Sequence, residues 1–600
     1  MDFQQRVKEC FLTEKGTPLK KAKILDCCEP GRPLFARTYS YSIINFAMRV
    51  FYLGEKDYFQ EANDALLENC RFYIDNKICR DDRDSFYWSI DIFCRIVEFF
   101  GSHGSVTPGL LYRSTEEKFL EMAYCWCKNN SVPDMWEYKK CGTWNVHESE
   151  NHHSQGFTTC WHLSKLMMQD AFSCDWKYDD GRTAKEHFLN WSEYINVWIS
   201  ERARKSLFVE CANGHYACET LKGIYNVFDF TPDEKTKRLA RNLLDLYYAT
   251  WAEEQLNGVR GGGKTRIYPN LSIKGNDGIR GWMYYYLGIG QKRTPGGNDY
   301  TVMTSAYRPL DIIAKLALRP QQRGAYEIKS QPLGLCEKGY YRNPDYRLKR
   351  DSGGICRYSY ATEKYIIGSL ITAPREFTDW TLISSQNRFQ GVIFGSHPDA
   401  RIVPIPECLA SDKTPIMRSY NQHYSAQRKS CLITQKLETS VDTGPMRVFF
   451  SRAGELDRLI EKNGWLFSRT EGAFAAVYIA DGGYELISTD AGVYAVCKNQ
   501  YSPVILETAL ESESAELDAF IDAILKNPLT QSEALLRYTS LNGDEFEFRK
   551  DYSALPTING KAALQQSDMA FESPFVRGKW NEGIVTVSFD GETKTLDFRL

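Results

Sequence analysis

The stretch Arg319-Pro320-Gln-Gln-Arg-Gly324 (RPQQRG) divides the sequence into two halves that space their apolar residues differently. Before it, apolar residues recur at helical spacing; after it, they alternate or form short β-branched and aromatic runs. Proline lacks a backbone donor and glycine admits unusual backbone angles, so the stretch is suited to ending a helical segment. We expect a multidomain α+β chain, with one domain at 1–320 and a second at 321–600.

Upstream of this break, the helical pattern runs from about residue 38 to 318, with polar or glycine-containing connections. The predicted helices cover 42–55, 58–74, 86–100, 115–128, 156–168, 184–201, 215–228, 233–253, 278–288 and 303–318. Thr231-Pro232 favours a helix start near Asp233, and Pro309 should kink or begin the last helix. No strand signal separates the helices, which favours an all-α layer or a closed ring of hairpins.

Downstream of the break, period-two and β-branched runs predict strands. They cover 355–360, 365–372, 380–384, 391–394, 447–450, 473–479, 493–497 and 584–589, and one helix is expected at 514–525. Asp481-Gly482-Gly483 and Asn542-Gly543-Asp544 are tight-turn signals beside such runs. This half should form a large antiparallel β-sandwich, either whole or divided into a main sandwich and a smaller C-terminal sheet.

Charge and composition indicate which binding partners and which cellular compartment to expect. The 600 residues carry a formal net charge of -3, so no global field attracts nucleic acid or an anionic membrane. The 18 cysteines contain no CxxC spacing, which favours free thiols in a reducing compartment. No apolar run approaches the roughly 20 residues that span a bilayer, and the charged N-terminus lacks a secretory apolar core. We expect a cytoplasmic protein, or a periplasmic or secreted one if residues before Met1 were removed; self-association is left open.

The segment Trp144 to Gln155 (WNVHESENHHSQ) contains three imidazoles, two carboxylates and three amides. Core positions rarely accept such density, so we expect this connecting segment to handle a polar ligand or a proton, with Trp144, Glu150, Asn151, His152 and His153 as candidates. A metal site is not favoured, because the helical H-E-x-x-H spacing and a cysteine pair are both absent. No cofactor is therefore expected, although a structural divalent metal remains an alternative, as does a purely structural role for the rings.

Two further polar stretches follow. In Phe208–Tyr216 (FVECANGHY), a polar turn with Glu210, Asn213, His215 and Tyr216 opens the next helix, where nearby positive charge could poise the tyrosine hydroxyl. The loop 257–270 (NGVRGGGKTRIYPN) lacks the Walker spacing, but its three glycines allow close backbone approach. Its cations, Lys264 and Arg266 among them, and Tyr268 would suit a carboxylate. In the second half, the cluster 418–424 with His423 is either an interdomain contact or a surface loop.

Taken in order, ENHH after Trp144, the Phe-x-Glu…Tyr helix start and the loop RGGGKTRIY resemble the helical half of the heparinase II/III and alginate lyase type of polysaccharide lyase. The segment YATEKYIIGS (360–369) is similar to the strand region that opens their sandwich half. The resemblance spans most of the chain and implies an incomplete (α/α) toroid followed by antiparallel β-sheets. It also implies cleavage of an acidic, uronate-containing oligosaccharide or polysaccharide by β-elimination.

This chemistry assigns expected roles. By resemblance Asn151 would neutralise the uronate carboxylate, and this sequence adds Arg266 as a cationic candidate. His152 and Tyr216 would be the acid and base, with Tyr268 and His423 in reserve. The other candidates, which are expected to contact substrate, are His153, Glu150, Glu210, His215, Lys264 and Trp144.

Two alternatives remain at this level. In a toroid glycoside hydrolase, Glu148 or Glu150 would work with Glu210 as an acid and base pair. In a non-catalytic glycan-binding protein, the histidines would be structural and no product would form.

Overall fold

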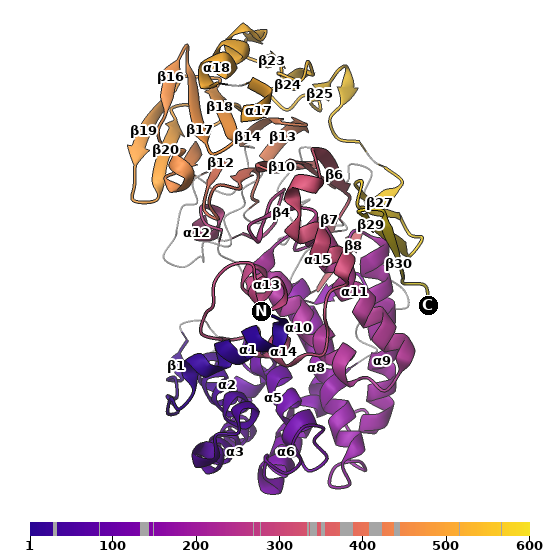
Figure 1. The fold of residues 1–600 in the computed structure, drawn as a ribbon. Coiled ribbons are helices and arrows are strands. Elements are labelled where there is room, and N and C mark those ends of the chain that lie inside the picture. The colour runs from indigo at the N-terminus through magenta and orange to yellow at the C-terminus, as the bar shows by residue number, and fades with distance from the viewer. Residues whose placement is uncertain are drawn as a thin grey trace.

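The structure is a computed structural model of the 600-residue chain. It describes all residues except 28–32, 83, 133–142, 148, 268, 276–277, 333–334, 337–344, 350–354, 373–387, 407–422, 437–443, 515 and 566. A helical N-terminal region is followed by a region rich in antiparallel β-sheet, so the mixed α+β class is confirmed (Figure 1). In the described part of the chain, no helix has the length and apolarity that crossing a bilayer would require.

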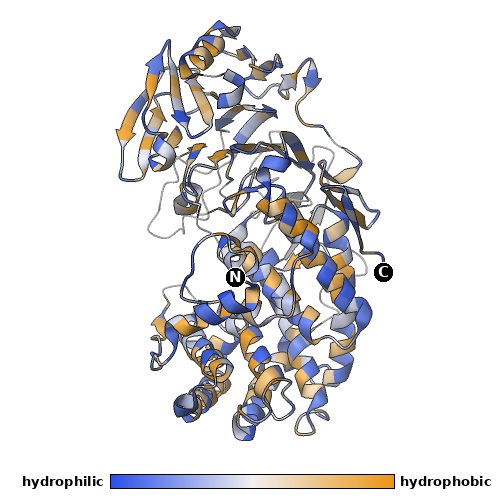
Figure 2. Cartoon of the chain, in the orientation of Figure 1, coloured by the Kyte–Doolittle hydropathy of each residue, from blue (hydrophilic) through white to orange (hydrophobic). Residues whose placement is uncertain are grey.

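The helical region is built from paired, amphipathic helices. They are α1 (Phe3–Phe11), α2 (Arg37–Leu53), α3 (Phe59–Asp75), α4 (Lys77–Asp81), α5 (Tyr87–Phe100), α6 (Arg113–Asn130), α8 (Glu150–Gln169), α9 (Ala184–Arg204), α10 (Gly214–Phe230), α11 (Glu234–Ala252), α12 (Pro269–Ser272), α13 (Gly278–Leu287), α14 (Asp299–Thr304) and α15 (Asp311–Leu318). Many carry an apolar stripe on one side and polar residues on the other (Figure 2). Most of the buried apolar residues of this region belong to one contiguous core.

Local chemistry sets several of these ends, and the start of α11 is the one that was expected. Asp233 caps α11 by accepting a hydrogen bond from the Thr236 backbone at 2.7 Å. Thr183 and Glu186 form a capping box at the start of α9. Pro309 lies between α14 and α15, so the single helix predicted there is two helices.

Helices α8 and α10 pack side by side and run in the same direction. Their first turns therefore lie next to each other. The Ser154 hydroxyl donates to the Thr220 carbonyl at 2.8 Å, and a Cβ at Gly223 would lie 2.1 Å from the Thr158 hydroxyl oxygen. Both contacts join residues about 65 positions apart. The two helices therefore run in the same direction with a nearly constant offset in residue number. The first turn of α8, with Asn151, is therefore level with the first turn of α10, with Tyr216.

Two expectations about the helical region are wrong. The segment ENHHSQ is not a connection, because α8 begins at Glu150, six residues before the predicted helix. Strands also occur in this half: β3 (Asn145–His147) pairs with β8 (Asp345–Lys349), and β4 (Gln255–Leu256) forms a hairpin with β5 (Val259–Arg260). Asn257 and Gly258, both with positive φ, form the hairpin turn, and Asn-Gly is the sequence signal that predicts such a turn.

The second region contains a twelve-stranded antiparallel sheet in the order β19-β20-β15-β12-β11-β10-β9-β6-β27-β28-β29-β30. In that order the strands are Tyr484–Ser488, Gly492–Cys497, Met446–Ser451, Arg401–Pro406, Gly391–Phe394, Tyr365–Thr372, Ile355–Ala361, Tyr326–Ser330, Met569–Glu572, Val576–Lys579, Ile584–Phe589 and Glu592–Asp597. The last four strands lie beside α11 and α15, and their buried residues join the helical core (Figure 1).

Smaller sheets lie beside the large one. A six-stranded sheet contains β13 (His423–Arg428), β14 (Cys431–Lys436), β21 (Val504–Leu510), β18 (Ala473–Ile479), β17 (Trp465–Thr470) and β16 (Ile460–Lys462). It shares an apolar core with the twelve-stranded sheet on one face. On its other face it packs against α18 (Leu517–Lys526) and a five-stranded sheet within residues 529–562. Strand β7 (Leu335–Cys336) pairs with β8.

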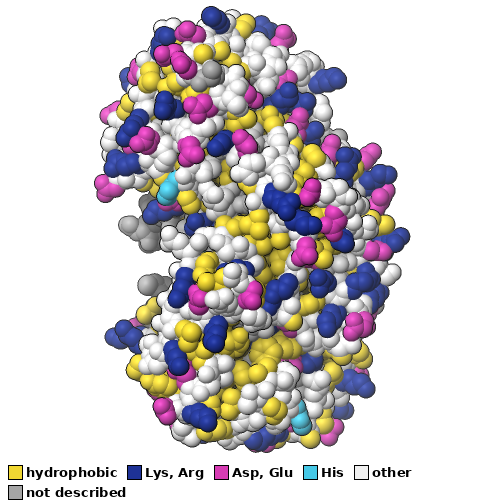
Figure 3. Space-filling view, in the orientation of Figure 1, with side chains coloured by type: hydrophobic (Ala, Val, Ile, Leu, Met, Phe, Trp, Pro, Cys, Tyr) yellow, Lys and Arg dark blue, Asp and Glu magenta, His cyan; other side chains and the backbone are white. Residues whose placement is uncertain are grey.

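The surface is close to electrically balanced. On the face drawn in Figure 3, basic and acidic side chains are interspersed and no large area carries one sign of charge. This distribution agrees with the formal net charge of -3.

The described cysteines are free thiols, most of them buried.

Candidate active site

The first turn of α8 meets the loop that precedes α10 through a buried amide and a buried carboxylate. The Asn151 Nδ2 atom donates to both carboxylate oxygens of Glu210, at 2.9 Å each. The two residues are 59 positions apart in sequence and both are buried. Since the two oxygens lie in nearly the same direction from Nδ2 while its two N–H bonds diverge, one N–H bond is left for another acceptor.

A second buried carboxylate, that of Glu150, stabilises the loop that carries Glu210. Glu150 accepts a hydrogen bond from the Glu210 backbone at 3.1 Å and pairs with Arg202 of α9 at 3.0 Å. Arg202 in turn lies 3.7 Å above the Trp144 ring. Burial raises the pKa of Glu150 to about 7, although the Arg202 charge acts in the opposite direction. Glu150 therefore supports the loop from a position that has no solvent access.

The loop carrying Glu210 is joined to the glycine-rich loop by backbone and side-chain bonds. Thr265 donates from its backbone to the Cys211 carbonyl at 3.1 Å and accepts from the Cys211 backbone at 2.8 Å. Asn213 donates to the carbonyls of Thr265 and Arg266, at 3.0 and 2.7 Å, and also caps α10. These bonds fix Arg266 relative to the start of α10.

Arg266, in the glycine-rich loop, contacts both Glu210 and Tyr216. Its Nη1 atom pairs with Glu210, and its guanidinium carbon lies 4.1 Å from the centre of the Tyr216 ring. The Arg266 side chain is 12% exposed, so this ion pair is shielded from most of the solvent. Asn151, Glu210, Arg266 and Tyr216 therefore lie in one contact network, whereas His152 contacts Asp84, Tyr87 and Trp88.

The backbone around this network is strained. Thr143, Ser206, Leu207, Ala212 and Arg266 all have φ between 51° and 68°, a region that non-glycine residues rarely adopt. Such conformations each cost about 1–3 kcal/mol and persist where surrounding contacts enforce them, commonly at functional sites.

The two neighbouring histidines of α8 have different environments. His152 is bonded through Nδ1 to the Tyr87 hydroxyl at 2.7 Å, its Nε2 atom lies 3.3 Å from Asp84, and its side chain is 14% exposed. His153 is buried and bonded to the Tyr194 hydroxyl of α9. Only His152 combines a hydrogen-bonded, oriented ring with access to solvent.

Several residues expected to contact substrate are instead buried supports. Trp144 donates to Glu201 at 2.9 Å beneath Arg202, and Lys264 places its ammonium 4.9 Å from the Phe389 ring centre. Glu150, His153 and Glu210 are buried as well. The polar groups of these three residues are bonded to protein partners: Glu150 to Arg202, His153 to Tyr194, and Glu210 to Asn151 and Arg266. Their assignment is corrected to positioning, while His215, at the start of α10, is exposed as a substrate contact requires.

His423 is also corrected. It lies buried in strand β13, with Nδ1 3.3 Å from the Thr434 hydroxyl oxygen, and is not in a surface loop. Burial lowers its pKa to about 3, with a further contribution from Arg388, so the ring is neutral at physiological pH. Tyr268 and Glu148 lie outside the described residues.

Sequence reasoning missed Asp84 and Tyr87, which hold His152, and Gln155. Within the described chain, neither the amide oxygen nor the amide nitrogen of buried Gln155 has a hydrogen-bond partner, and the same is true of the Asn151 Oδ1 atom. Gln155 follows Asn151 by four residues, so both lie on one face of α8. That spacing would have identified Gln155 if the helix start had been recognised. Buried polar atoms normally form hydrogen bonds, so these amides are suited to binding a polar ligand.

The network can neutralise an acid and transfer protons. It brings an amide, a guanidinium and a phenol together, and the oriented imidazole of His152 is on the residue next to Asn151 on α8. Among the described residues, no group of three or more His, Cys, Asp or Glu side chains is placed to share a metal ion.

No protein-family model and no curated protein matches this chain.

Proposed function

We propose that this protein is a lyase that cleaves uronate-containing oligosaccharides or polysaccharides by β-elimination. The observation that carries the proposal is the contact network of Asn151, Glu210, Arg266 and Tyr216, assembled from three separate segments at the starts of α8 and α10. His152, next to Asn151 on α8, supplies the imidazole.

The proposed site first binds the uronate carboxylate. Removing the proton from the adjacent carbon, C5, places negative charge on the carboxylate oxygens, so donors aimed at them lower the barrier. The second N–H bond of Asn151 and the positive charge of the Arg266 guanidinium are suited to this role. Glu210 does not repel the substrate in this scheme, because its charge is already matched by Arg266. Glu150 is matched by Arg202 in the same way.

His152 and Tyr216 then move the protons. One takes the C5 proton, the electron pair forms the C4–C5 double bond, the C4–O bond breaks, and the other protonates the departing oxygen. Asp84 and Tyr87 orient the His152 ring. The Arg266 guanidinium stabilises negative charge that develops on the Tyr216 oxygen. Which of the two acts as base depends on the sugar epimer.

The finer fold assignment belongs to the same proposal. We infer that the paired helices form an incomplete (α/α) toroid with α5, α8 and α10 on its inner side. We also infer that the twelve- and six-stranded sheets form a β-sandwich. Support comes from the parallel packing of α8 against α10 and from the apolar core that the two sheets share.

The test is product formation from a panel of mannuronate, guluronate, glucuronate and iduronate oligosaccharides. A lyase creates a conjugated double bond that absorbs ultraviolet light, whereas a hydrolase yields new reducing ends without it. Tyr216→Phe should abolish the absorbance while leaving the melting temperature nearly unchanged, because the ring and its contact with Arg266 remain. Reducing ends without absorbance would support the hydrolase, and binding without any product would support the glycan-binding alternative.

A further inference from the structure

The glycine-rich loop is pressed against the second region so closely that no side chain fits. A Cβ at Gly262 would lie 2.1 Å from Glu254 Oε1 and 2.4 Å from Arg357 Nη2. From the opposite side, a Cβ at Gly368 of strand β10 would lie 2.5 Å from the Gly262 Cα atom. The three glycines therefore allow the loop that carries Arg266 to lie directly on the large sheet.

Arg357 of strand β9 clamps this loop across the boundary between the two regions. Its Nε atom donates to the Gly263 carbonyl at 2.7 Å, and Nη2 donates to the Gly261 carbonyl at 3.4 Å. Nη2 also pairs with buried Glu254, which binds Arg260 at 3.0 Å. Burial acts to raise the pKa of Glu254, but the Arg357 and Arg260 charges outweigh it and hold the pKa below its ordinary value.

The clamp reaches the candidate active site through a short backbone path. Gly263, held by Arg357, is followed by Lys264, whose backbone exchanges bonds of 3.0 and 2.9 Å with Phe389 of the second region. Thr265 is joined to the loop that carries Glu210, and Arg266 pairs with Glu210 itself. Two residues, Lys264 and Thr265, thus separate the clamped Gly263 carbonyl from Arg266, which carries the proposed carboxylate-binding guanidinium.

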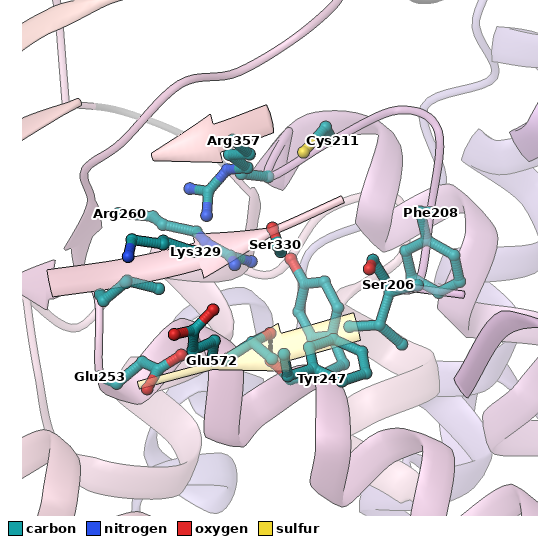
Figure 4. A pocket seen from close by; sticks show the side chains of 15 residues that line it. Ser206, Phe208, Cys211, Tyr247, Glu253, Arg260, Lys329, Ser330, Arg357 and Glu572 are labelled. Atoms are coloured by element: carbon teal, nitrogen blue, oxygen red, sulfur yellow. Dashed lines mark hydrogen bonds between the residues drawn. The ribbon is translucent and has the colours of Figure 1, made fainter. Parts of the chain in front are cut away.

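A cavity of about 30 Å³ lies between the clamp and the Glu210 loop. Arg260 and Arg357 reach it from one side, and Ser206, Phe208 and Cys211 line the side of the loop (Figure 4). The volume suits about one water molecule. Arg357 and the Glu210 loop therefore face the same small cavity.

We infer that Arg357 is a positioning residue of the active site, so that the β-sheet region sets the location of Arg266 and Glu210. The inference rests on the proposed function only for its kinetic consequence. Its structural consequence, ordering of residues 261–266 and 206–213, can be measured without any substrate.

The experiment compares Arg357→Lys with Arg49→Lys in the full chain. Arg49 is also buried and also binds one buried carboxylate, Glu55, and two backbone carbonyls, but it lies in α2, away from the site. Arg357→Lys should speed amide hydrogen exchange in 261–266 and 206–213 and lower kcat about a hundredfold with a smaller change in KM, because misplacement by about 1 Å can cost this much. Arg49→Lys should change neither.

The outcomes separate the two proposals. Unchanged exchange in both segments, or an equal kinetic loss in Arg49→Lys, would overturn the positioning role. Faster exchange in Arg357→Lys together with no lyase activity in the wild type would sustain the positioning role and refute the proposed reaction. If Arg357→Lys does not fold, Ser359→Ala, which removes only a 2.6 Å bond to Glu254, should give a smaller effect of the same kind. Absence of that effect would also overturn the inference.

Discussion

Replacing Glu210 by glutamine should weaken the link between Asn151 and Arg266. The Oε1 atom of Glu210 accepts from both residues, and Oε2 accepts from Asn151 at 2.9 Å. A carboxamide that keeps its oxygen at the Oε1 position loses the second Asn151 bond, because its nitrogen cannot accept from Asn151 Nδ2. Arg266 also loses its counter-charge in a site with little solvent. We expect Glu210→Gln to destabilise the fold by about 2–3 kcal/mol, at the lower end for a broken buried ion pair, since Arg266 keeps some exposure.

A double-mutant cycle isolates this interaction. Glu210→Gln, Arg266→Gln and the double variant would be compared by urea unfolding, followed by tryptophan fluorescence, and by initial rates of ultraviolet-absorbing product. Because both single variants remove the same ion pair, the double variant should cost about 2 kcal/mol less than their sum. Additive losses, within about 0.5 kcal/mol, would refute the reasoning, because distant independent sites behave in that way.

Three further predictions concern single positions. His152→Ala should abolish turnover with little loss of stability, whereas His153→Ala should destabilise the fold by about 2–4 kcal/mol by removing a buried, bonded ring; reversed effects would contradict the assignment. Burial raises the pKa of Glu253 to about 8, above its unfolded value, so its protonated form stabilises the fold at low pH and this contribution is lost as pH rises toward 8. Glu253→Gln should therefore raise the melting temperature by about 2 °C or more at pH 8.5 but not at pH 4, and an equal change at both pH values would argue against burial as the cause. Gly262→Ala should prevent correct folding or cost more than about 3 kcal/mol, while Gly290→Ala, also at positive φ but with open space around it, should cost about 1 kcal/mol; circular dichroism melting compares the two, and equal losses would exclude the steric argument.

Much of the candidate site could be predicted from residue types, but not the role of each residue. The sequence identified Asn151, Glu210, Arg266 and Tyr216 because their polar segments are unusual between apolar helices. It could not distinguish His152 from His153, since neighbouring positions on a helix point about 100° apart and the direction of the core was unknown. One ring met α5 and solvent, and the other met Tyr194.

The buried supports were mistaken for ligand contacts for a related reason. Glu150 and Trp144 looked like surface residues because a charged and aromatic segment without a recognised helix start resembles a loop. Their partners, Arg202 and Glu201, lie more than 50 residues away on α9, and no local pattern indicates that pairing. The strand β3 was missed because its partner β8 lies about 200 residues downstream.

By itself, the sequence determined the division into a helical and a β-rich part, since the period of apolar residues depends only on local backbone geometry. It also determined the capped start of α11 at Asp233, because capping acts within one turn. Tertiary structure alone decided that Glu210 joins Asn151 to Arg266 and that Arg357 lies on the glycine-rich loop. Contacts between distant segments depend on how whole helices and sheets pack, and that packing is a property of all the apolar surface together.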